Sequence, residues 1–213
     1  MMQLLRGLNG NSVQWVSGTT KHETLYQLFD RMKSGQQSPD SDVPASYFTF
    51  GFVRNPWERV SSLYRYLNEK RPRPEIASVT SVEDFIEQAG SGVPWIRGLH
   101  SMRPQIDFFR RTPTSMPEAD FIGHYEHLAE DFSNVARLLG LPAVELPHLN
   151  RSSNSRADYR NSYSARSAEI VAHLFQRDIE AFGYSFDQRL PLKRCSGPVK
   201  ALSGNLRYQV ILP

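Results

Sequence analysis

The sequence has little cysteine, no long apolar run and no dense basic tract. Cys195 is the single cysteine among the 213 residues, so the chain cannot form an internal disulfide. No stretch is long and apolar enough to predict a transmembrane helix, and the N-terminus lacks the charged and apolar regions of a secretory signal. These absences predict a cytoplasmic protein in a reducing compartment.

Positive charge is in only small excess over negative charge. The chain carries 25 Lys and Arg residues against 22 Asp and Glu residues, which gives a formal net charge of +3. The basic residues are dispersed and mostly arginine, whereas nucleic-acid-binding arms concentrate them in tracts. We therefore expect no nucleic-acid partner and favour a small anionic ligand.

The remaining composition fits one globular domain, because 39% of the residues are hydrophobic. Residues 1–20 show no sustained period and are interrupted by Gly and Asn, which predicts an irregular lead-in. We therefore divide the chain into a lead-in over residues 1–20, a domain over residues 21–187 and a tail over residues 188–213. The tail ends in "NLRYQVILP", a possible strand.

Several segments have the periodicity of helices and strands. Thr20 and Glu23 predict a capping box, followed by a helix whose apolar residues recur at i, i+3, i+4 and i+7 from Leu25. Residues 47–53 ("YFTFGFV") predict a buried strand. Further predictions are a helix after Pro56, a helix capped by Ser81, a short strand and helix over residues 119–139, and one amphipathic helix over residues 167–184.

This alternation of strands and helices predicts an α/β fold with a parallel β-sheet flanked by helices. In such folds, ligands bind at the carboxyl ends of the strands. Residues 91–118 form a long connection punctuated by Gly and Pro, which indicates either disorder or a substrate loop.

The junction between the strand and the next helix has a distinctive order of residues. Asn55 is the expected N-cap and Pro56 the first helical residue, so the helix directs the free N–H groups of its first turn and its positive dipole end beyond the strand. Arg54 adds a bidentate donor for phosphate or sulfate, and Ser62 adds a hydroxyl. A second interpretation stays open, in which Arg54 pairs with a nearby carboxylate and Ser62 only fills space.

The stretch "FGFVRNPWERVSSLY" resembles the 3′-phosphate-binding motif of the sulfotransferases that use 3′-phosphoadenosine 5′-phosphosulfate (PAPS), in particular the branch of carbohydrate sulfotransferases and their bacterial relatives. The segments "KHETLYQLFDRM", "FIGHYEHLAEDF", "LPHLNRSSN" and "EIVAHLFQRDIEAFGYSF" follow in the family's order, so the resemblance spans residues 21–187. It implies a P-loop-NTPase-like sulfotransferase fold that transfers a sulfuryl group from PAPS to a hydroxyl acceptor, expected to be a carbohydrate.

The resemblance also implies roles for five residues. Arg54 and Ser62 match the positions that hold the 3′-phosphate of the cofactor, and His22 matches the histidine that takes the proton of the acceptor hydroxyl. Arg151 and Ser152 lie in the segment that closes over the adenosine bisphosphate. Independently, His22 is expected in the first turn of its helix, where the positive helix end would keep the imidazole neutral and basic. The alternative is a histidine that makes a local capping contact.

One family feature is missing from the sequence. The loop that holds the 5′-phosphosulfate has the form Pro-Lys-x-Gly-x-Ser/Thr, and residues 1–20 contain no match to it. Three explanations stay open: an N-terminally truncated sulfotransferase, a degenerate relative that binds nucleotide or acts as an interaction module, and a protein completed by another chain.

We expect no metal site. His124, His127 and Glu130 have a spacing that could suggest one, but no other His or Cys cluster accompanies them and the resemblance implies none. Basic side chains in or beside the long connection could meet an acidic acceptor or form a solvated surface. They are Arg97, Arg103, Arg110 and Arg111.

Overall fold

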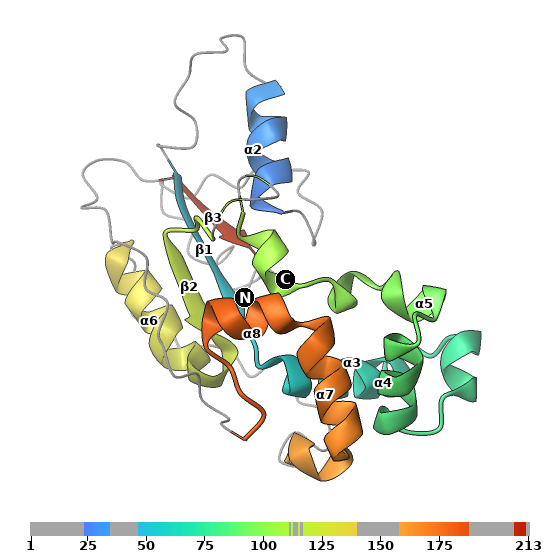
Figure 1. Cartoon of the computed structure of the whole chain (residues 1–213). Helices are drawn as coiled ribbons and strands as arrows, with labels where there is room; N and C mark the ends of the chain where they lie inside the picture. The colour runs from blue at the N-terminus through green and yellow to red at the C-terminus, as the bar shows by residue number, and fades with distance from the viewer. Residues whose placement is uncertain are drawn as a thin grey trace. The chain divides into compact units, whose positions relative to one another are not determined.

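The structure is a computed structural model that describes residues 24–34, 47–110, 112, 115, 117–139, 158–187 and 207–211. The chain divides into two compact units. We call Met1–Val53, Gln105–Pro147 and Arg194–Pro213 the sheet unit, and Arg54–Pro104 with His148–Lys193 the helical unit. Figure 1 traces their elements along the chain.

The sheet unit is built on three parallel strands. Strand β1 (Tyr47–Val53) lies between β2 (Phe121–His124) and β3 (Arg207–Ile211), in the order β2-β1-β3 (Figure 1). The predicted strand over residues 47–53, the short strand after residue 119 and the strand in the tail are all confirmed. With helices alternating along the chain, the predicted α/β class with a parallel sheet is confirmed as well.

Strand β1 is buried along its described length, as its apolar sequence predicts. Residues Phe48, Phe50 and Val53 are between 0% and 1% exposed. A partly buried polar contact fixes its register with β2: the Asp120 carboxylate accepts hydrogen bonds of 2.8 Å from both the N–H and the hydroxyl of Thr49. Asp120 directly precedes Phe121, which pairs with Phe50. The carboxylate therefore sets where the ladder begins.

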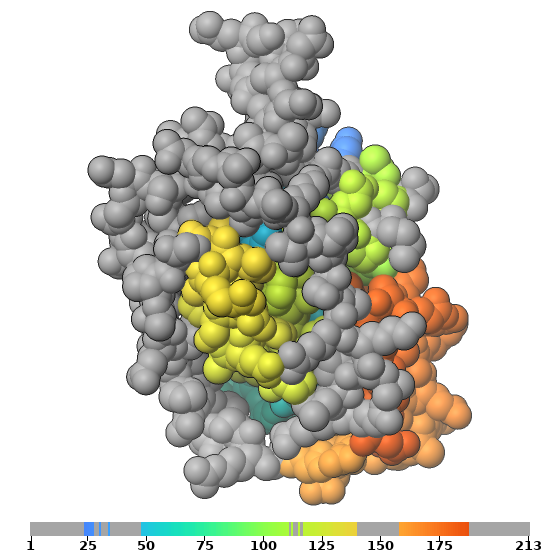
Figure 2. Space-filling view, turned by 90° about the vertical axis from the view of Figure 1, so that its left-hand side faces the viewer, coloured from blue at the N-terminus to red at the C-terminus, as the bar shows by residue number. Residues whose placement is uncertain are grey.

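Helix α6 (Leu128–Leu138) follows β2 through a turn of 3₁₀-helix, η5 (Tyr125–His127), and packs against that strand. The Asp131 carboxylate in its first turn accepts a 2.7 Å hydrogen bond from the N–H of His124, at the end of β2. The outer surface of α6 is visible in yellow in Figure 2. The predicted strand and helix over residues 119–139 are thus confirmed.

Gly123 in β2 lies close to side chains of both β1 and α6. A Cβ atom at this position would lie 2.6 Å from the ring of Phe52 and 3.0 Å from the Cβ of Asp131. We expect Gly123→Ala to lower the free energy of unfolding by about 1 to 3 kcal/mol, because the core must shift to admit the methyl group. Urea unfolding measures this change. Adding Phe52→Leu should recover part of the loss, and strictly additive effects of the two substitutions would contradict the close approach.

Helix α2 (Leu25–Ser34) confirms the first predicted helix but not its start. Thr24 caps it: the Gln27 N–H donates to the Thr24 hydroxyl at 3.2 Å, and the Thr24 N–H donates to the Gln27 side chain at 3.0 Å. The predicted start at Thr20 is therefore wrong, because a second capping box lies four residues later. Thr20 and Glu23 lie outside the described residues.

The helical unit packs several helices around α3 (Pro56–Glu69). Helices α4 (Val82–Gly90) and α7 (Ala165–Leu174) lie side by side and both contact α3 (Figure 1). The Trp57 indole donates a 2.9 Å hydrogen bond to the carbonyl of Ala168 in α7. The other elements of this unit are η2 (Pro74–Ser78), α5 (Pro94–Arg97), η3 (His100–Met102), η6 (Tyr159–Ser162) and α8 (Gln176–Phe182).

Three predictions are resolved by these helices. The helices capped by Asn55 and by Ser81 are confirmed, since both side chains accept hydrogen bonds from first-turn N–H groups. The single helix over residues 167–184 is wrong: the backbone breaks at Phe175 and separates α7 from α8. The apolar period runs through this break, so periodicity alone does not reveal it. No helix in the described ranges is both long and apolar enough to cross a bilayer.

Candidate functional site

The start of α3 is held by the side chain of Asn55, which is fully buried. Its Oδ1 accepts hydrogen bonds from the N–H groups of Trp57 at 3.0 Å and Glu58 at 3.3 Å. The Arg59 N–H donates to the Asn55 carbonyl at 2.8 Å, and Pro56 has no N–H. The prediction that the first-turn N–H groups are free is therefore wrong, and an anion at this junction would depend on side chains.

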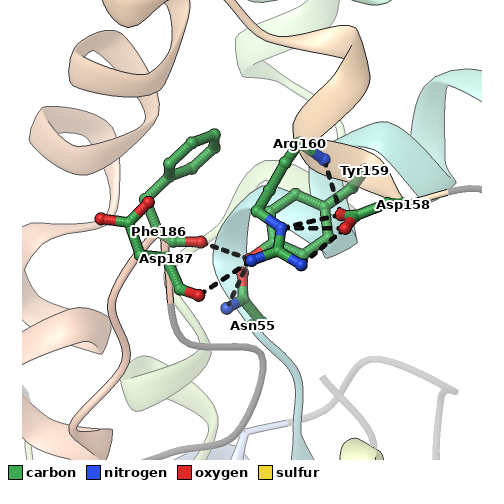
Figure 3. A network of polar contacts seen from close by, with 6 residues as sticks. All are labelled: Asn55, Asp158, Tyr159, Arg160, Phe186 and Asp187. Atoms are coloured by element: carbon green, nitrogen blue, oxygen red, sulfur yellow. Dashed lines mark hydrogen bonds and ion pairs between the residues drawn. The ribbon is translucent and has the colours of Figure 1, made fainter.

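The amide nitrogen of Asn55 ties the same helix start to a distant part of the chain. It donates to the Ser185 carbonyl at 3.3 Å. It also donates to the Tyr159 hydroxyl at 3.4 Å, and the Tyr159 hydroxyl donates to the Phe186 carbonyl at 2.6 Å (Figure 3). Burial raises the pKa of Tyr159 to about 12, so its hydroxyl stays protonated and donates at neutral pH. One buried amide thus fixes three segments of the helical unit.

Arg160 closes this network from the surface. Its guanidinium pairs with the Asp158 carboxylate at 2.6 Å and donates to the Asp187 carbonyl at 3.0 Å (Figure 3). The described chain resumes at Asp158, six residues after Ser152. The segment that carries the predicted "LNRSSN" contacts therefore joins a part of the chain that is anchored to the start of α3.

We expect Asn55→Ala to lower the free energy of unfolding by about 2 to 3 kcal/mol, since it removes an N-cap and leaves buried partners unsatisfied. Chemical denaturation measures the loss. Asn68→Ala is the matched control, because Asn68 is exposed and its amide donates only to a carbonyl of its own helix; its effect should stay within about 0.5 kcal/mol. Equal effects of the two substitutions would refute the cross-linking role of Asn55.

Arg54 lies one residue before the cap, and its side chain forms an ion pair. Its Nη2 donates to the Glu58 carboxylate at 3.0 Å, and the two side chains are only 22% and 15% exposed. The structure thus contains the carboxylate partner of the second interpretation. The pair also holds the guanidinium beside the first turn of α3, where a phosphate could compete with the carboxylate for it.

Ser62 lies on the same face of α3, one turn beyond Glu58. It is partly exposed and makes no hydrogen bond within the part of the chain that the structure describes. Arg54, Glu58 and Ser62 therefore follow one another at intervals of four residues. The two residues that the motif assigns to the 3′-phosphate thus lie on either side of Glu58 along the chain, and their joint role stays a prediction.

Arg59 is a buried arginine that the sequence reasoning missed. It is 9% exposed, donates to the Arg103 carbonyl at 3.0 Å, and places its guanidinium 5.9 Å from the centre of the Phe175 ring. Burial lowers the pKa of Arg59 to about 10, while Asp178 opposes that shift. The side chain connects α3 with the long connection and with the break between α7 and α8. No sequence signal marks an arginine inside a helix as buried.

Three predicted site residues, His22, Arg151 and Ser152, lie outside the described residues. Their roles stay predictions. For His22 one argument changes: because α2 begins at Leu25, its predicted place in the first turn of that helix is wrong.

The described residues contain no group of three or more His, Cys, Asp and Glu side chains that could hold a metal ion. Of the three residues whose spacing could suggest a metal site, His127 lies 3.8 Å from the Glu130 carboxylate. His124 is buried at the end of β2.

Comparison with known proteins identifies the family of the chain. A sequence model described as the sulfotransferase family matches residues 1–185. The chain belongs to the sulfotransferase family. The match covers all five residues that the resemblance singled out, and it includes residues 1–20, where the 5′-phosphosulfate motif has no counterpart.

One curated relative of this chain comes from Archaeoglobus fulgidus (strain ATCC 49558 / DSM 4304 / JCM 9628 / NBRC 100126 / VC-16). The two chains are 31% identical over 96 residues, which are 45% of this chain and 70% of the relative. The relative is named only as an uncharacterized protein, so its name adds no activity. No solved structure matches the chain significantly.

Proposed function

We propose that this protein transfers the sulfuryl group of PAPS to a hydroxyl group of a carbohydrate acceptor. One observation supports the proposal most: in a member of the sulfotransferase family, Arg54 directly precedes the N-cap of α3 and pairs with Glu58 in its first turn, and the partly exposed Ser62 lies four residues beyond Glu58 on α3. A guanidinium and a hydroxyl one to two turns apart can both donate to the oxygens of a single phosphate. The 3′-phosphate of the cofactor carries such oxygens.

In this proposal the Arg54–Glu58 ion pair belongs to the ligand-free state. A phosphate dianion offers two strong acceptor oxygens to the guanidinium, whereas Glu58 accepts through one oxygen. The phosphate therefore takes over some or all of the Arg54 donors when the nucleotide binds. The buried Asn55 network keeps the helix start in place during this exchange, since its hydrogen bonds to Trp57, Tyr159 and Ser185 are made by the Asn55 side chain and not by Arg54.

The remaining roles follow the resemblance. Arg151 and Ser152 close over the adenosine bisphosphate, and the His22 imidazole takes the proton of the acceptor hydroxyl. The hydroxyl oxygen forms a bond to sulfur as the bond between sulfur and the 5′-phosphate oxygen breaks. Adenosine 3′,5′-bisphosphate leaves, and the acceptor becomes a sulfate ester.

Transfer of labelled sulfuryl tests the function. The full chain is incubated with PAPS labelled in its sulfuryl group and with a panel of sugars and simple alcohols. We expect labelled sulfate ester and adenosine 3′,5′-bisphosphate in equal amounts with at least one sugar. Tight binding of the bisphosphate with no transfer to any acceptor would instead support the alternative, a nucleotide-binding or interaction module built on the same fold.

A further inference from the structure

Arg65 lies on the same face of α3 as the two residues assigned to the phosphate. It follows Ser62 by three positions and Glu58 by seven, and residues at these intervals are neighbours on a helix surface. Side chains in a helix also lean toward its N-terminus. By this rule the Arg65 side chain runs back along the turn that carries Ser62.

Arg65 has no partner for its charge among the described residues. It makes no hydrogen bond or ion pair there, not even with Glu69 four positions on, and its Nε is buried and unsatisfied. Unsatisfied buried donors are rare in folded proteins and need an explanation. Ser62, beside it, also makes no hydrogen bond in these ranges. Two adjacent polar side chains therefore lie unused on one face of the helix.

The charges on this face of α3 indicate that Arg65 and Ser62 lack an anionic partner. Arg54 is neutralised by Glu58, so the pair contributes no net charge to the face. A 3′-phosphate carries close to two negative charges at neutral pH, and it would meet the Glu58 carboxylate as well. Arg65 is the cation on this face of α3 that no carboxylate neutralises in the described structure.

Tyr163 is a neutral side chain that feels the charge of Arg65. Burial raises the pKa of Tyr163, whereas the nearby charge of Arg65 acts in the opposite direction. The Tyr163 hydroxyl donates to the Trp57 carbonyl at 2.7 Å, so it is already engaged. Tyr163 therefore lies within electrostatic reach of the Arg65 charge and, as a neutral phenol, does not neutralise it.

We propose that Arg65 is a second arginine of the phosphate site, which binds the nucleotide 3′-phosphate together with Ser62 and Arg54. This inference rests on the proposed function and adds a ligand-binding residue that neither the motif nor the comparisons assign. Arg65 supplies the positive charge that Glu58 cancels at Arg54. The phosphate then lies over the turn between Glu58 and Ser62.

The test compares adenosine 3′,5′-bisphosphate with adenosine 5′-monophosphate, since the ratio of their affinities isolates the 3′-phosphate. Isothermal titration calorimetry is run on the unmodified full chain, Arg65→Met, Arg65→Lys and Arg54→Ala. Arg65→Met should lower the preference for the bisphosphate by about tenfold, the usual worth of one charge-assisted hydrogen bond. Arg65→Lys should retain part of it. Arg71→Met, an exposed arginine beyond the end of α3, should leave the ratio unchanged.

The outcomes separate this inference from the function on which it rests. A preference that Arg54→Ala abolishes and Arg65→Met leaves intact would overturn the role of Arg65 alone. An unmodified chain with no preference for the bisphosphate would overturn the proposed function, and the inference with it. Thermal melts of each variant show whether a lost preference reflects unfolding, and Arg65→Lys keeps the test decisive if Arg65→Met does not fold.

Discussion

Replacement of Arg54 by alanine should lower the affinity for adenosine 3′,5′-bisphosphate by about a hundredfold and leave the affinity for adenosine 5′-monophosphate nearly unchanged. The guanidinium donates through two nitrogens to a phosphate, and alanine removes both charge-assisted hydrogen bonds. It also leaves the Glu58 carboxylate unpaired beside the phosphate. Calorimetry with the two nucleotides measures the difference.

The control for Arg54→Ala is Arg71→Ala, which removes the same charge from an exposed position after α3. Its bisphosphate affinity should remain within a factor of about two, since exposed charges are screened by solvent and salt. A similar loss in both variants would attribute the effect to overall charge. An unchanged affinity in Arg54→Ala would remove the basis of the 3′-phosphate site.

His22→Ala should slow sulfuryl transfer by a factor of about 100 to 10,000, the usual contribution of a general base. Nucleotide binding should survive, because His22 is assigned to the acceptor hydroxyl and not to the cofactor. Initial rates with labelled PAPS and calorimetry with the bisphosphate measure the two quantities separately. The rate should also fall as the pH becomes acidic, since only the neutral ring accepts a proton.

His173, exposed on α7, provides the matched control. His173→Ala should transfer sulfuryl at the unmodified rate. If His22→Ala retains full activity, another group takes the proton and the assignment from the resemblance is wrong. If it loses nucleotide binding in parallel with activity, His22 acts on the cofactor or on the fold.

The parts of the fold that the sequence predicted are those with local signals. An Asn-Pro cap, an aromatic strand and a serine cap each act within a few residues, and β1, α3 and α4 lie where these signals place them. The start of α2 was missed because two capping boxes compete within eight residues, and the one at Thr24 forms. The break at Phe175 was missed because both helices keep the same apolar period.

The parts of the site that the sequence did not predict depend on distant contacts. Asn55 was expected to cap α3, but its bond to Tyr159 joins residues 104 positions apart and has no local signature. The sequence predicted only an unspecified nearby carboxylate as the alternative partner of Arg54. The structure identifies it as Glu58, four residues further on. Arg59 and Arg65 are both arginines of α3, six positions apart. Only packing distinguishes the buried Arg59, which cross-links helices, from Arg65, which has no charge partner among the described residues.

A crystal structure of the full chain with adenosine 3′,5′-bisphosphate tests the central claim most directly. The account predicts the 3′-phosphate within hydrogen-bond distance of the Arg54 guanidinium and the Ser62 hydroxyl, with Asn55 still capping α3. A bound nucleotide whose 3′-phosphate lies elsewhere, with Arg54 still donating to Glu58, would contradict it.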